Sequence, residues 1–149
     1  MRSFVATLLL GTLVASAHGD LVQLVPSRDA TLYEDPEGAV SNGGGGAMFA
    51  GRNSQTTNSV RRALLAFDIA AAIPPGATIT SVSLRLSNDA SNVSPQMLSL
   101  HRVSADWGEG SVLGSGSGGS GGPAAPGDAT WIHRSFNPLA WVAPGGDFA

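Results

Sequence analysis

RRALLAFDIAAAIPPGATITSVSLRLSN, residues 61–88, contains two alternating runs joined by a proline-glycine turn. In the first run apolar residues recur at every second position from 63 to 69, which predicts a strand with one side toward a core and a mixed other side. Residues 74–76 end this run, because proline has no N–H to donate to a ladder and glycine accepts a positive φ. The second run starts at Ile79 and predicts another strand. Its alternating apolar positions are Val82, Leu84 and Leu86.

Short strands and turns are predicted along the rest of the chain as well. A third alternating run spans 97–103, after a turn-forming segment. Weaker strand signals lie before the quoted stretch, at 21–25, 29–34 and 49–52. A content of 20 glycines and only 13% charged residues is typical of such a protein. We therefore expect an all-β, antiparallel β-sandwich in which the glycine- and serine-rich tract at 114–127 is a loop that does not pack.

The N-terminus has the parts of a secretory signal: Arg2, an apolar stretch at 4–14 and small residues at 15–17. The apolar stretch is too short to span a bilayer core of about 30 Å. We therefore predict cleavage of residues 1–17, secretion, and one module at 18–149 with no membrane span. The chain has no cysteine, so packing or a bound ion must stabilise it. Losing Arg2 changes the formal net charge from −3 to −4, which argues against nucleic acid as a partner.

Two further segments, LHRVSADWGEG at 100–110 and ATWIHRSFNPLAWVAPGGDF at 129–148, complete a recognisable order of motifs. Together with the quoted stretch, they resemble the DNRLRE-type extracellular domain, which is related to carbohydrate-binding module family 96. The resemblance covers roughly residues 27–148. It implies a jelly-roll β-sandwich in a secreted or surface protein, and some relatives bind acidic polysaccharides such as alginate.

The chain departs from this family in two places. Ser111 to Gly114 stand where relatives continue into a Thr-Val-Thr-Trp strand, and the chain stops at Ala149 where relatives add strands that close the sandwich. We therefore expect a C-terminally truncated product or fragment. An open sheet of this kind exposes unpaired N–H and C=O groups and is prone to self-association.

Asp106 and Glu109 form the densest candidate site. Two carboxylates three positions apart, beside glycine turns, could bind Ca²⁺, which takes six to eight oxygen ligands. The alternative, which we favour, is structural: Asp106 caps the turn while Trp107 covers the edge of the core.

Three arginines suggest a second site. If adjacent strands align their solvent faces, Arg62, Arg85 and Arg102 form a row that binds uronate carboxylates through bidentate hydrogen bonds. The alternative is an ordinary solvated face whose arginines pair with Asp68 and Glu109.

Trp131 and His133 are candidates for stacking on sugar rings, although tryptophans in a sandwich more often pack in the core or at its rim. Enzyme motifs are weak, because the G-x-S-x-G match at 118–122 has neither a strand before it nor a helix after it. We therefore predict a non-catalytic secreted module that binds polysaccharide or attaches a larger protein to it. The alternative is a structural cell-surface or matrix spacer with no sugar site.

Overall fold

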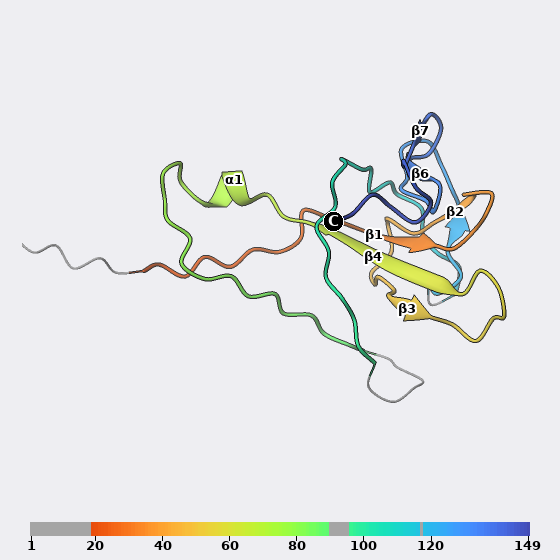
Figure 1. Ribbon diagram of the computed structural model, residues 1–149, viewed down its shortest axis with the longest axis horizontal. Coiled ribbons are helices and arrows are strands. Elements are labelled where there is room, and N and C mark those ends of the chain that lie inside the picture. The colour runs from red at the N-terminus through yellow and green to blue at the C-terminus, as the bar shows by residue number, and fades with distance from the viewer. Residues whose placement is uncertain (1–18, 90–95, 117) are drawn as a thin grey trace, which may run out of the picture.

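The computed structural model describes residues 19–89, 96–116 and 118–149 (Figure 1). The predicted signal at 1–17 lies outside these residues. Strands joined in antiparallel pairs account for nearly all of the regular structure, which confirms the all-β class. None of the described helices is long and apolar enough to cross a membrane.

The main sheet has three strands in the order β1-β4-β3. β1 (Arg28–Tyr33) pairs along its whole length with β4 (Val60–Ala66), and β3 (Gly51–Arg52) pairs with the start of β4. Two small sheets join the remaining strands. They are β2 (Val40–Ser41) with β5 (Gly122–Pro123), and β6 (His133–Ser135) with β7 (Leu139–Ala140).

The core lies on one face of the main sheet. Its buried apolar side chains come from β1, β4 and three later segments: Ala30, Leu32, Leu64, Trp107, Ala129 and Trp141. The indole N–H of Trp141 donates to the carbonyl of Thr130 at 2.9 Å, which satisfies the polar atom of a ring that is only 5% exposed. On β4 the core side is the row of Arg62, Leu64 and Ala66, of which Leu64 is buried. The prediction that the apolar row beginning with Ala63 and Leu65 faces the core is therefore wrong.

The strand predicted to reach residue 69 ends earlier, at Ala66. Asp68 accepts a hydrogen bond from the backbone N–H of Ala71 at 3.0 Å and so caps a single helical turn, α1 (Ile69–Ala72). A carboxylate at this position accepts a hydrogen bond from an N–H group that has no backbone partner within the turn. In an extended chain, the same N–H group would need a partner on a neighbouring strand.

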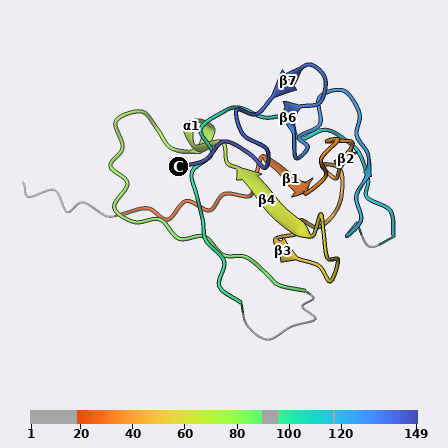
Figure 2. The same cartoon turned by 45° about the vertical axis from the view of Figure 1, so that its right-hand side comes forward.

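The strands predicted at 79–86 and 97–103 are not formed. We call residues 77–89 and 96–102 the arm; it has no regular structure, and all of its residues are exposed. In both views most of it lies apart from the sheets, and its last residues return toward the C-terminus (Figures 1 and 2). An alternating pattern is stabilised as a strand only where a neighbour pairs with its backbone and a second layer covers its apolar side. Of the third predicted strand, only an isolated bridge between Val103 and Phe148 is present. The weak signal at 21–25 also gives no strand.

The glycine- and serine-rich tract packs more than its composition predicts. Its Gly122 and Pro123 form β5, and the hydroxyl of Tyr33 donates to the carbonyl of Gly118 at 2.6 Å. A Cβ on Gly114 would lie 2.7 Å from the carbonyl oxygen of Gly118, so the absence of a side chain lets the loop fold tightly upon itself. The expectation that residues 114–127 do not pack is therefore wrong.

Candidate functional site

An open hollow lies beside Arg62 of β4. It has a volume of about 630 Å³ and is lined by Arg62, residues 104–105 and the C-terminal segments 142–144 and 146–148. We call it the Arg62 pocket. Backbone hydrogen bonds join the segment around Ser104 to the C-terminal segment of the lining. The N–H of Ser104 donates to the carbonyl of Asp147, and the N–H of Ala149 donates to the carbonyl of Arg102.

The guanidinium of Arg62 contacts two aromatic rings. Its central carbon is 5.0 Å from the ring centroid of Trp131 and 4.8 Å from that of Phe148. One Nη atom donates to the carbonyl of Gly145 at 2.6 Å. The ring of Phe148 also packs against that of His101, with centroids 5.0 Å apart. Both rings thus attract the arginine cation electrostatically and fix its orientation.

A turn at 144–146 makes this arrangement possible. Gly145 has φ +92°, and a Cβ there would lie 2.5 Å from the Arg62 Nη1 atom and 2.9 Å from the Trp131 ring. The N–H of Gly145 donates to the carbonyl of Trp131 at 2.6 Å. Glycine is therefore required at this position both by the backbone conformation and by the close approach of the two side chains.

Among the described residues, none neutralises the charge of Arg62 by forming an ion pair with it. In the described part of the chain the one ion pair is Arg28–Asp106, so no carboxylate pairs with Arg62. Asp147 lines the pocket, but its two oxygens accept the backbone N–H groups of Val142 and Ala143, each at 3.0 Å. The pocket therefore presents the Arg62 cation, the hydrogen-bonded carboxylate of Asp147 and an aromatic ring, Phe148, that is 45% exposed.

The predicted row of three arginines is not built. Arg62 belongs to the main sheet, whereas Arg85 lies in the arm, outside any sheet. Arg102 is exposed, and its carbonyl bonds Ala149 next to the Val103–Phe148 bridge. The row required neighbouring strands at 79–86 and 97–103, and these strands are missing.

Of the two predicted stacking residues, only Trp131 joins Arg62. His133 is on β6, where its Nδ1 lies 3.1 Å from the hydroxyl of Thr130 and its ring meets Phe136 edge-on at 5.2 Å between centroids. It does not line the Arg62 pocket. The imidazole of His133 is therefore held by Thr130 and Phe136 and not by residues of the Arg62 pocket.

Asp106 and Glu109 are held by different partners. Asp106 pairs with Arg28 at 2.9 Å, and this hydrogen bond and charge lower the pKa of the Asp106 carboxyl. Glu109 accepts the backbone N–H of Asp29 at 2.9 Å. Burial, and to a lesser degree the charge of Glu109, raise the pKa of Asp29. No three His, Cys, Asp or Glu side chains of the described residues gather to hold a metal ion, so the calcium site stays a prediction.

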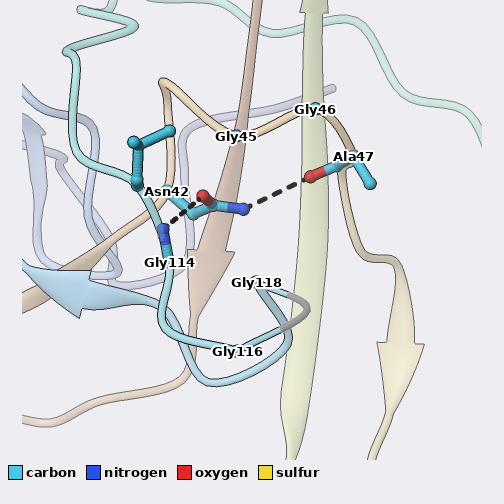
Figure 3. A pocket seen from close by; sticks show the side chains of 8 residues that line it. Asn42, Gly45, Gly46, Ala47, Gly114, Gly116 and Gly118 are labelled. Atoms are coloured by element: carbon cyan, nitrogen blue, oxygen red, sulfur yellow. Dashed lines mark hydrogen bonds between the residues drawn. The ribbon is translucent and has the colours of Figure 1, made fainter.

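A second, smaller hollow of about 290 Å³ lies between two glycine-rich loops (Figure 3). The side chain of Asn42 links the loops, because its Oδ1 accepts the N–H of Gly114 at 2.9 Å and its Nδ2 donates to the carbonyl of Ala47 at 3.2 Å. The described lining carries no charged group. Its geometry thus points to a role in loop structure.

Sequence reasoning missed Phe148, Gly145 and Asn42. Pro144, Gly145 and Gly146 signal a turn, but nothing in the spacing of the chain links that turn to β4. Comparison with known proteins adds no assignment: no family model, no curated protein and no solved structure matches the chain.

Proposed function

We propose that the chain is a non-catalytic, secreted module of the DNRLRE type, with a jelly-roll topology, that binds acidic polysaccharide in the Arg62 pocket. The observation that carries this proposal is the guanidinium of Arg62, which is oriented by two aromatic rings, bonded to a carbonyl and paired with no described carboxylate.

A uronate residue matches the chemistry of the pocket. Its carboxylate is planar and accepts two parallel N–H bonds from a guanidinium, and such charge-assisted bonds are roughly twice as strong as neutral ones. The apolar face of a sugar ring fits against an exposed aromatic side chain such as Phe148. An open hollow also admits an internal unit of a polymer, whereas a closed cavity would accept only a small molecule.

Affinity electrophoresis in gels containing alginate or polygalacturonate tests the proposal. We expect the wild-type chain to be retarded and Arg62→Ala to bind at least about tenfold more weakly, which corresponds to roughly 1.4 kcal/mol for a lost charged hydrogen bond. Arg62→Lys keeps the positive charge but loses the planar guanidinium that donates two parallel hydrogen bonds, so its affinity should lie between those of the wild type and Arg62→Ala. Retardation should decrease with salt and be absent in a neutral polysaccharide.

Two control variants change the net charge by the same amount. Arg52→Ala alters an exposed residue on β3 that bonds the hydroxyl of Ser59. Arg85→Ala alters the arm. Both should keep wild-type retardation. If all three arginine variants weaken binding equally, the attraction is a general charge effect and the Arg62 pocket is not the site.

A structural spacer is the second candidate function, favoured by the exposed arm. It predicts that the wild-type chain is not retarded by any polysaccharide. Retardation that depends on Arg62 would reject it.

A further inference from the structure

The arm exposes apolar side chains that the other described residues do not cover. Fifteen large apolar side chains are exposed in the described part of the chain, and seven of them lie in the arm. They are Ile79, Val82, Leu84, Leu86, Met97, Leu98 and Leu100. Val82 is 86% and Met97 is 95% exposed, values expected of an unfolded chain rather than of a packed one. Exposed apolar surface of this extent is typical of an interaction site.

The total surface of the chain leads to the same conclusion. The chain exposes 11583 Å², whereas a compact monomer of 15.0 kDa exposes only about 7,000 Å². Counting the first 18 residues as fully exposed accounts for at most roughly 2,700 Å². An excess of about 2,500 Å² over a compact remainder is left. A stable interface needs only about 800 Å² from each partner, and the exposed segments together exceed this; the arm holds seven of their fifteen exposed large apolar side chains.

One part of the arm, residues 78–89, also has the alternating pattern of a β-strand. Val82, Leu84 and Leu86 occupy alternate positions, with polar residues between them. From 78 to 89, no backbone hydrogen bond joins the arm to another described residue. A strand with one apolar side and unpaired N–H and C=O groups pairs readily with another chain.

Charge favours a second copy of the same chain as the partner. The arm carries Arg85, Arg102 and Asp89, a net charge of +1, whereas the other described residues carry a net charge of −5. Neither arginine forms an ion pair with a described residue. The arm of one copy is therefore attracted to the acidic remainder of another.

From these observations we infer that the chain forms a dimer in which the arm of each copy pairs as a strand with the other copy and buries the row of Val82, Leu84 and Leu86. Reciprocal exchange of the same element gives a closed, two-fold symmetric dimer. This association is independent of the Arg62 pocket, since none of its three apolar residues lines that pocket.

Light scattering on a sizing column, over a hundredfold range of concentration, tests the dimer. The chain is expressed with its leader and purified as the host processes it. We expect twice the monomer mass for the wild type. Leu84→Asp should raise the dissociation constant at least tenfold, because it places a charge in the buried row. The matched control Ser83→Asp adds the same charge at the neighbouring, oppositely directed position and should remain dimeric.

Hydrogen exchange gives a second, independent measurement. Amides at 79–86 should be protected in the concentrated wild type and in Ser83→Asp, and should exchange freely in Leu84→Asp. Unfolding followed by tryptophan fluorescence shows whether the core is intact in each variant, because no tryptophan lies in the arm. A wild-type chain that is monomeric throughout would overturn the inference. So would equal weakening by both aspartates, or aggregates without a defined mass.

Discussion

Asp29 and Asp106 respond to folding in opposite ways, although both lie near the start of β1. Arg28 lowers the pKa of Asp106 through a hydrogen bond and its charge. Burial and Glu109 raise the pKa of Asp29. Asp106 therefore stabilises the fold above its unfolded pKa of about 3.8, and this contribution is lost as the pH falls through its lower folded pKa. For Asp29, stability is fully present below about 3.8 and is lost as the pH rises through its raised folded pKa.

Two conservative substitutions test the direction in which each carboxyl changes the stability of the fold. At pH 7, Asp106→Asn should lower the urea midpoint, because it removes the partner of Arg28. Asp29→Asn should raise that midpoint, because it removes a carboxylate that is costly to ionise; its backbone bond to Glu109 is kept. Both differences in urea midpoint from the wild type should shrink toward pH 3. The change in the free energy of unfolding caused by Asp29→Asn should stay below about 1 kcal/mol. Shifts in the same direction at pH 7 would contradict the assignment.

At the scale of elements, the loop at 114–121 depends on Tyr33. This side chain is 2% exposed and comes from β1, and its hydroxyl bonds the carbonyl of Gly118. Burial raises the pKa of Tyr33, an effect that exceeds the opposing ones of Asn42, Thr31 and Arg61. Because charging a buried phenol is unfavourable, stability should fall as the pH rises above about 10.

Tyr33 is the only tyrosine, so an ultraviolet titration of the phenolate reports on this residue alone. We expect its midpoint above 10 in the folded chain and near 10 in urea. Tyr33→Phe should cost about 0.5–1.5 kcal/mol in urea unfolding and increase hydrogen exchange in the loop. A midpoint at or below 10 in the folded chain would show that the loop does not bury the ring.

Local patterns identified the strands that find partners nearby. The signals at 29–34, 49–52 and the start of the quoted stretch correspond to β1, β3 and β4. The pattern at 79–86 is just as regular, yet it forms no strand, because alternation describes which side a residue takes and not whether a neighbouring strand exists. β2 and β5 have two residues each, too few to show any period.

The candidate site was predictable only in part for a related reason. Arg62 and Trp131 stood out by residue type. Their contact depends on Gly145 and Phe148, which meet β4 from more than 80 positions away. A contact between residues so far apart in the sequence depends on the tertiary fold, and the local sequence pattern does not predict it.

At the scale of the whole molecule, the described residues include a packed part built on the sheets and the exposed arm. Proteases need an extended, unpaired segment of backbone, which the arm provides around Arg85. Arg52 is also exposed, but its backbone is paired in β3. Trypsin should therefore cut first after Arg85, leaving the fluorescence of Trp107 and Trp141 in the core unchanged. Arg85→Gln should remove this first cut.

The same digestion, repeated over a range of protein concentrations, tests whether a second copy covers the arm. If a second copy pairs with the arm, cleavage after Arg85 needs prior dissociation, so its rate should fall as the protein concentration rises above the dissociation constant. Leu84→Asp should be cut quickly at every concentration, while Ser83→Asp should follow the wild type. Because the substitutions lie beside the cleaved bond, their effect on the protease itself is measured on matched peptides. A rate per molecule that does not change with concentration in the wild type would mean that the arm stays uncovered.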